Sequence, residues 1–352
     1  MRRLPLYFLI DVSESMAGDP IERVQEGMAT IIRDLRTDPH ALETVYVSIV
    51  VFAGKARRIA PLMELPQFYA PRLPIGAGTS LGEALYLLMD DIDKNVVRAS
   101  TQVKGDWKPL VFLLTDGVPT DDYSAALYEW KTRFKTRANL VAIGFGEGVD
   151  TSVLNDLTDH VYSFQDSDPA AYVQFFRWIS QSVKSSSLAV SKGQDGGINL
   201  SKIGEDVLKK VDFSAIQTRR LLDDRYAVMV GKCQKTEKPY LMKYMRTQRP
   251  GDEWLSGLNI ETREYRLLGS YPVDSQYFEL SDGQESTVSI NTEELVGFPG
   301  CPHCGNPYGF SLCGCGKLFC TGGESPSRCP WCHTEMQMDM GDGSANVNRT
   351  AG

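Results

Sequence analysis

Hydroxyl and carboxylate side chains gather in three short segments that together could hold a metal ion. The segments are Asp11-Val12-Ser13-Glu14-Ser15, Gly76-Ala77-Gly78-Thr79-Ser80 and Thr115-Asp116-Gly117. Mg²⁺ takes six oxygen ligands in near-octahedral geometry and usually keeps some of its water. Two carboxylates and three hydroxyls supply such oxygens and leave the ion able to accept a carboxylate from another molecule. We expect the ion to be Mg²⁺, or alternatively Mn²⁺ or Ca²⁺.

Each of these segments, taken singly, has a common structural explanation. Asp-x-Ser-x-Ser is a frequent loop composition that often caps a helix, and Thr-Asp-Gly is an ordinary turn. Ser80 is a candidate cap for a helix that begins at Leu81, with Glu83 completing a capping box. The joint occurrence of the three segments at successive strand ends is what favours a metal site.

The elements around these segments alternate between strand and helix patterns. Short apolar runs predict buried strands at Leu6–Ile10, Val45–Phe52, Leu110–Leu114 and Leu140–Phe145, with an antiparallel edge strand at Arg57–Leu62. Amphipathic periodicity predicts helices at Ile21–Leu35, Leu81–Val97, Tyr123–Arg137 and Ala170–Val183. This order predicts a doubly wound, mostly parallel α/β domain over residues 1–187. Ligands of such sheets bind at the carboxyl ends of strands, where the three segments lie.

Cysteines form the second group of residues with a chemical role. Cys301-Pro-His-Cys304 and Cys329-Pro-Trp-Cys332 each have the two-residue gap of a zinc knuckle. We expect one zinc ion bound by Cys301, Cys304, Cys329 and Cys332. The remaining clustered cysteines are possible ligands of a second metal ion, could replace two of the outer ligands, or are free and buried; they are Cys313, Cys315 and Cys320.

The eighth cysteine, Cys233, stands alone and is expected to be structural. The spacing does not predict the cross-braced set of eight ligands that a RING-type ubiquitin ligase needs. Because so small a module lacks an adequate apolar core, bound metal would supply much of its folding free energy.

The chain between and beyond these two sites changes character several times. A polar, glycine-containing linker is expected at residues 188–204, and a β-rich segment at residues 205–295. Its strands are predicted at Tyr226–Val230, Tyr240–Met245, Tyr265–Leu268 and Tyr277–Leu280. Residues 296–338 form a zinc-ribbon-like module with a hairpin over residues 309–320, and residues 339–352 are expected to be a disordered tail.

Charge and hydropathy exclude several functional classes. The formal net charge is −8, and Lys317 and Arg328 are the only basic residues between Cys301 and Cys332, so nucleic-acid binding is not expected. No apolar run approaches the roughly 20 residues of a membrane-spanning helix. The apolar stretch after Arg3 is short, and no small-residue cleavage site follows it, which argues against a secretion signal. We therefore expect a cytoplasmic protein.

The three oxygen-rich motifs, in this order and spacing, resemble those of von Willebrand factor A (vWA) domains over roughly residues 4–186. The resemblance implies a metal-ion-dependent adhesion site in which Ser13, Ser15 and Thr79 offer hydroxyls, while Asp11 and Asp116 hold the ion directly or through water. The array that contains Cys-Gly-Cys-Gly-Lys-Leu-Phe-Cys and ends in Cys-Pro-Trp-Cys resembles the C-terminal module of the TerY family of bacterial tellurite-resistance proteins.

That family resemblance implies a metal-binding module and partners in phosphorylation signalling. Members are often encoded beside a serine/threonine kinase and a 2C-class protein phosphatase, in systems linked to metal or chemical stress. The expected function is a non-enzymatic scaffold that binds a carboxylate of a partner protein.

Two other functional classes remain open. One is a metal sensor or metallochaperone that acts through the C-terminal cysteines. The other is a metal-dependent hydrolase, but no histidine lies near the three motifs, because His40 and His160 are elsewhere in the sequence. We therefore expect no catalytic residue.

Overall fold

A computed structural model of the chain describes residues 2–145, 151–164, 168–191, 200–201, 208–210, 225–247, 264–282, 288–323, 326–337 and 344–350. The chain divides into two compact units. The first consists of Met1–Pro74 and Thr79–Leu221, and the second is formed mainly by Leu222–Gly352.

A seven-stranded, mostly parallel sheet runs through the first unit, in the order β3-β2-β1-β4-β5-β6-β7. The parallel strands are β1 (Leu4–Asp11), β2 (Val45–Phe52), β4 (Leu110–Thr115), β5 (Asn139–Phe145) and β6 (Val161–Phe164). The two antiparallel strands are β3 (Ala56–Glu64), the predicted edge strand, which pairs with β2, and β7 (Lys209–Lys210). Every residue of β1 is buried because helices cover both faces of the sheet.

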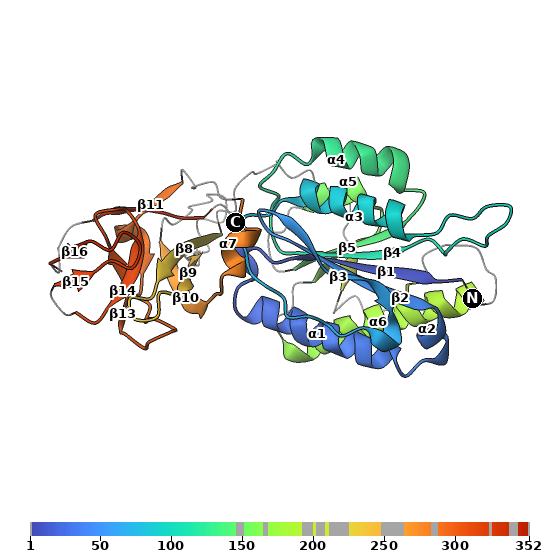
Figure 1. Ribbon diagram of the computed structural model, residues 1–352, viewed down its shortest axis with the longest axis horizontal. Helices are drawn as coiled ribbons and strands as arrows, with labels where there is room; N and C mark the ends of the chain where they lie inside the picture. The colour runs from blue at the N-terminus through green and yellow to red at the C-terminus, as the bar shows by residue number, and fades with distance from the viewer. Residues whose placement is uncertain are drawn as a thin grey trace, which may run out of the picture. The chain divides into compact units, whose positions relative to one another are not determined.

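Helices lie on both faces of this sheet, which confirms the doubly wound α/β class (Figure 1). One face carries α1 (Asp19–Leu35), α2 (Pro39–Thr44) and α6 (Pro169–Ser191). The other carries α3 (Leu81–Asn95), α4 (Ser124–Glu129) and α5 (Thr151–Leu157), and a π-helical turn at Trp130–Phe134 continues α4.

The short elements α2, α5 and β6 were not predicted, because segments of four to seven residues show too little periodicity. The sequence signal of α2 lies in its cap. For α2, the Asp38 side chain accepts a hydrogen bond from the Ala41 N–H at 2.8 Å, and Pro39 occupies the first turn.

The second unit is built on a six-stranded sheet in the order β12-β10-β9-β8-β14-β13. The strands are β8 (Tyr226–Lys232), β9 (Pro239–Arg246), β10 (Tyr265–Pro272), β12 (Leu295–Val296), β13 (Tyr308–Leu312) and β14 (Leu318–Thr321). The predicted hairpin of the cysteine module is confirmed, since β13 and β14 pair antiparallel. Because β14 also pairs in parallel with β8, the β-rich segment and the cysteine module share one sheet and are not separate modules as expected.

Two further expectations for the second unit are corrected. Tyr277–Leu280, predicted as a strand, lies in helix α7 (Gln276–Leu280), where Asp274 accepts the Gln276 N–H at 2.9 Å. The tail expected to be disordered contains β17 (Asn346–Asn348), which pairs with β11 (Ser289–Asn291) and buries Val347. Alternation over so few residues is too weak to identify either element from sequence.

The expected linker at residues 188–204 begins inside α6, which continues to Ser191. Ser187, placed at the domain boundary by its serine-rich context, is a buried helical residue whose hydroxyl is hydrogen-bonded to that of Thr44 at 2.7 Å. Residues 192–199 and 202–204 lie outside the described residues.

Close packing of α1 on α6 depends on Gly27. A Cβ at this position would overlap the ring of Phe176, which is itself buried. We expect Gly27→Val to lower the free energy of unfolding by about 1–3 kcal/mol, because the ring has little room to move. Denaturant unfolding of the full chain measures the change. The double variant Gly27→Val/Phe176→Leu should recover part of the loss, and equal stability of wild type and Gly27→Val would contradict this packing.

Candidate metal sites

The first candidate site lies where the strand order of the α/β sheet reverses. Strand β1 is paired in parallel with β2 on one side and β4 on the other, so β1 and β4 end at the same edge of the sheet. Asp11 is the last residue of β1, Thr115 is the last of β4, and Thr79 lies just before α3. Parallel pairing thus brings together motifs that are about 100 residues apart in sequence, as the hydrogen-bond separations show.

Hydrogen bonds join four of the five predicted ligands into a chain. The hydroxyls of Ser13 and Ser15 are 2.9 Å apart, and the Ser15 hydroxyl donates to Asp116 Oδ1 at 2.8 Å. The Ser13 N–H donates to Asp11 Oδ1 at 2.9 Å. The structure therefore places Asp11, Ser13, Ser15 and Asp116 together as the sequence predicted.

Thr79 reaches the same place across Gly117. A Cβ built on Gly117 would be 3.5 Å from Thr79 Oγ1 and 3.6 Å from Asp11 Oδ2, so both oxygens face this glycine. The Thr79 N–H donates to the hydroxyl of Thr120 at 2.8 Å, which fixes the loop before α3 against the segment after β4. All five side chains expose at most 6% of their surface.

Asp11 is completely buried, and its surroundings change its pKa. The Thr115 hydroxyl donates to its Oδ2 at 2.5 Å. Burial first, and then the negative charge of Asp116, raise the pKa of Asp11 to about 7. A bound cation would offset both effects, and the ligand atoms are all oxygens, so the residues present fit a hard divalent ion.

Glu14, which lies between Ser13 and Ser15 in the sequence, is completely buried. Ser80 and Glu83 do not form a capping box, because the Ser80 hydroxyl donates to Gly54 O and Glu83 accepts the Ala56 N–H. Asp121 caps α3 instead, accepting the Gly82 N–H at 2.8 Å, and it was missed because it lies 39 residues away in sequence.

The second unit brings its eight cysteines into two groups of four. In each group the sulfur atoms all lie within 4.8 Å of one another. Group A consists of Cys233, Cys301, Cys304 and Cys320, and group B consists of Cys313, Cys315, Cys329 and Cys332. The two outer pairs expected to share one ion belong to different groups, so that ligand set is corrected.

The geometry of both groups fits a tetrahedral metal ion. Four sulfurs bonded to zinc at about 2.3 Å lie about 3.8 Å from one another. The sulfur–sulfur distances are 3.7 Å for Cys304 and Cys320, 3.6 Å for Cys313 and Cys332, and 4.0 Å for Cys315 and Cys329.

A recurrent turn explains how Cys233 joins the other ligands. In three places the N–H four residues after a cysteine bonds to the carbonyl of that cysteine, and the donor residue has a positive φ. The three pairs are Glu237 with Cys233 at 2.8 Å, Gly305 with Cys301 at 2.9 Å and His333 with Cys329 at 2.9 Å. Cys233 has no second cysteine two residues further on, so the spacing of the cysteines did not indicate that it belongs to a group. The total of eight cysteines, which matches two sites of four, was the available signal.

The two groups interleave along the chain. Cys313 and Cys315 of group B precede Cys320 of group A, and the last two cysteines return to group B. The two groups are therefore cross-braced, which the cysteine spacing did not predict. The order along the chain begins with three cysteines of group A, namely Cys233, Cys301 and Cys304.

Comparison with protein families identifies both units. A model of the von Willebrand factor type A domain matches residues 6–177, and a model of the TerY-C metal binding domain matches residues 223–352. The chain contains both domains. We refer to the first unit as the vWA domain and to the second as the TerY-C domain.

The individual relatives reported next each match part of the chain. Inter-alpha-trypsin inhibitor heavy chain H1 of Bos taurus is 25% identical over 152 residues, which span 42% of this chain and 17% of that protein. Among solved structures, the ArnB paralog VWA2 from Sulfolobus acidocaldarius is 18% identical with a TM-score of 0.39, and covers 52% of this chain and 45% of its own. The vWF domain of the type V pili tip protein Mfa5 from Porphyromonas gingivalis is 14% identical with a TM-score of 0.40, and covers 58% and 99%.

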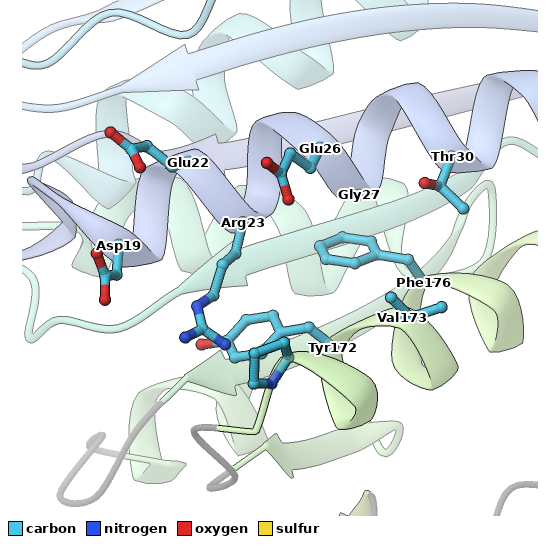
Figure 2. Close-up of a pocket in the computed structure, with 10 residues that line it drawn as sticks. Asp19, Glu22, Arg23, Glu26, Gly27, Thr30, Tyr172, Val173 and Phe176 are labelled. Carbon is cyan, nitrogen blue, oxygen red and sulfur yellow. The ribbon is translucent and has the colours of Figure 1, made fainter.

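A groove of about 330 Å³ between α1 and α6 is separate from the oxygen site of the vWA domain. Figure 2 shows the carboxylates of Asp19, Glu22 and Glu26 on α1, and the Arg23 guanidinium beside the ring of Tyr172. The distance from Arg23 Cζ to the centroid of this ring is 4.7 Å. None of the five predicted oxygen ligands lines it.

Of the described helices, none combines the length and the apolar composition that are needed to cross a membrane.

The capping role of Asp121 gives a test of the site's framework. We expect Asp121→Ala to lower the free energy of unfolding of the vWA domain by about 1 kcal/mol, because the Gly82 N–H loses its acceptor. Asp90→Ala is the control, since Asp90 is exposed and pairs only with Lys94 among the described ion pairs. Equal effects of the two variants in thermal unfolding would refute the assignment.

Proposed function

We propose that the vWA domain binds a carboxylate of a partner protein through Mg²⁺ held by Asp11, Ser13, Ser15, Thr79 and Asp116. The supporting observation is the buried convergence of these five oxygen-bearing side chains at the ends of β1 and β4. Ser13, Ser15 and Thr79 would offer hydroxyls, and the two carboxylates would hold the ion directly or through water. Three of the five ligands are neutral, so the ion keeps affinity for an external carboxylate.

The proposed role is that of a non-enzymatic scaffold in the cytoplasm. The hydrogen-bonded network of the site consists of aspartate, serine and threonine side chains, and the proposal assigns no general base to it. The proposed partners are a serine/threonine kinase and a 2C-class protein phosphatase of a stress or metal-resistance system. The resemblance of the cysteine module to the TerY family supports this choice of partners.

The TerY-C domain, in this proposal, holds two structural zinc ions, one in group A and one in group B. The support is the tetrahedral spacing of the sulfurs and the supply of four thiols to each ion. Because the groups interleave, the two ions together would tie β8, β13 and β14 to the knuckles that follow.

Stabilisation of the full-length chain by Mg²⁺ tests the first part of the proposal. At a Mg²⁺ concentration about a hundred times its Kd, a native-state ligand adds about 2.7 kcal/mol to stability. For a domain of this size the melting temperature should rise by about 5–10 °C. Thr79→Val, which keeps the side-chain shape and removes one hydroxyl ligand, should show a smaller rise, whereas the exposed control Thr132→Val should match wild type.

Asp11→Ala is a poorer first variant, because it leaves the Ser13 N–H and the Thr115 hydroxyl without their buried acceptor. Retention of a kinase or phosphatase from lysate, with Mg²⁺ or with chelator, then tests docking by wild type and Thr79→Val. Retention that is identical in every condition would show that the site is not the docking surface. A Mg²⁺ stabilisation that is unchanged in Thr79→Val would remove Thr79 from the ligand set.

Elemental analysis tests the zinc assignment. Purified wild-type chain should contain two zinc ions. Cys233→Ser should contain one, because group A then lacks one of its four thiolates. His303→Ala should keep two, since the ring of His303 is hydrogen-bonded to Pro239 O at 2.8 Å and is not part of either group. Two zinc ions in Cys233→Ser would remove Cys233 from the ligand set.

A further inference from the structure

The two cysteine groups differ in their access to solvent. In group A, Cys233, Cys301 and Cys320 are buried and Cys304 is half-buried. In group B, Cys313 and Cys329 are buried, but Cys315 and Cys332 are exposed. Group B therefore has two residues that are exposed to solvent, whereas group A has none.

The elements that carry the two groups also differ, because those of group A are more closely packed than those of group B. Group A is anchored on the sheet, because Cys233 directly follows β8 and Cys320 lies within the neighbouring strand β14. Its three buried cysteines pack in one apolar cluster with side chains such as Tyr240 and Tyr244.

Group B is carried by two turns, one between β13 and β14 and one between β15 (Ser327–Arg328) and β16 (Glu335–Met336). In the described part of the chain its apolar cluster comprises Cys313, Cys329 and Phe319, with Trp331 and Met336 partly buried against them. A Cβ built on Gly314 or Gly316, which flank Cys315, would meet no atom within 4 Å. The first turn is therefore open on the side of the exposed ligand.

Exposure of a thiolate ligand changes how its metal ion can leave. An incoming cation can bond to an exposed sulfur while zinc is still held by the others, so zinc need not dissociate fully first. Four thiolates also favour soft cations over hard ones. A closed site in a packed cluster lacks this route.

We propose that group B is an exchange site for thiophilic cations, whereas group A keeps its zinc as a structural ion. This inference rests on the two zinc ions of the proposed function, and it adds a sensing or buffering role to the TerY-C domain. In the exchange, four bonds from sulfur to the incoming divalent cation replace four Zn–S bonds. One Zn²⁺ leaves as its hydrated ion, so charge balances and neither electrons nor protons are transferred.

Trp331 gives group B an internal reporter. It lies between the ligands Cys329 and Cys332, its indole N–H donates to Leu318 O at 2.7 Å, and Lys232 Nζ is 5.3 Å from its ring. A change of ion in group B alters the knuckle around this ring. Tryptophan fluorescence should therefore respond to exchange in group B.

The test is a stopped-flow titration of full-length, zinc-loaded protein with CdCl₂. Zinc release is followed with a chromogenic chelator, Cd–thiolate bonding by ultraviolet absorption, and the knuckle by fluorescence. We expect one equivalent of zinc to leave in a fast phase accompanied by the fluorescence change, and the second in a separate slow phase. Trp331→Phe should lose the fluorescence change and keep the fast release.

Ligand variants assign the two phases. Cys332→Ser and Cys315→Ser should each lose the fast equivalent, whereas Cys304→Ser, in group A, should retain it. Two zinc ions that leave at a single rate, or a fast phase without a Trp331 signal, would overturn the exchange role and leave the two-zinc proposal intact. A zinc content of one ion in the wild-type chain would instead overturn both.

Discussion

Parallel pairing of β1 between β2 and β4 is the constraint on which the vWA site depends. It sets the carboxyl ends of two neighbouring strands side by side, and with them Asp11 and the segment that follows Thr115. The same pairing buries both carboxylates, and burial together with the charge of Asp116 disfavours the ionised form of Asp11, which a bound cation would favour. Thr120 and Asp121 then fix the motif that contains Thr79, because they accept hydrogen bonds from Thr79 and from the first turn of α3.

In the TerY-C domain, the corresponding organising feature is a sheet whose strands and cysteines come from distant parts of the chain. Strand β8 ends beside Cys233, and β14, which carries Cys320, pairs with it in parallel. The sheet thereby holds two of the four cysteines of group A, and the knuckle that contains Cys301 and Cys304 supplies the other two. Group B uses turns outside this packed centre, and this difference in support separates a closed site from an open one.

Both sites follow the same physical rule with different ligand chemistry. Hydroxyls and carboxylates buried at strand ends suit a hard ion that keeps an open position for a partner, whereas groups of four thiols suit a soft or borderline ion in a complete tetrahedral shell. The proposed function of the vWA site depends on an incomplete shell. Group B derives its proposed function from a complete shell that solvent can reach at Cys315 and Cys332.

The sequence by itself determined the α/β class, the long strands and helices of the vWA domain, its five candidate ligands and the metal-binding nature of the cysteines, because these depend on local periodicity and on motifs. Only the tertiary structure decided that Cys233 lies in one group with Cys301, Cys304 and Cys320, that Cys329 belongs to the other group, and that Asp121 rather than Ser80 caps α3. It also showed that Tyr277–Leu280, expected to be a strand, lies in a helix and that Asn346–Asn348, expected in a disordered tail, forms a strand. These features depend on long-range pairing, and spacing along the chain carries no information about which distant residues a sheet brings together.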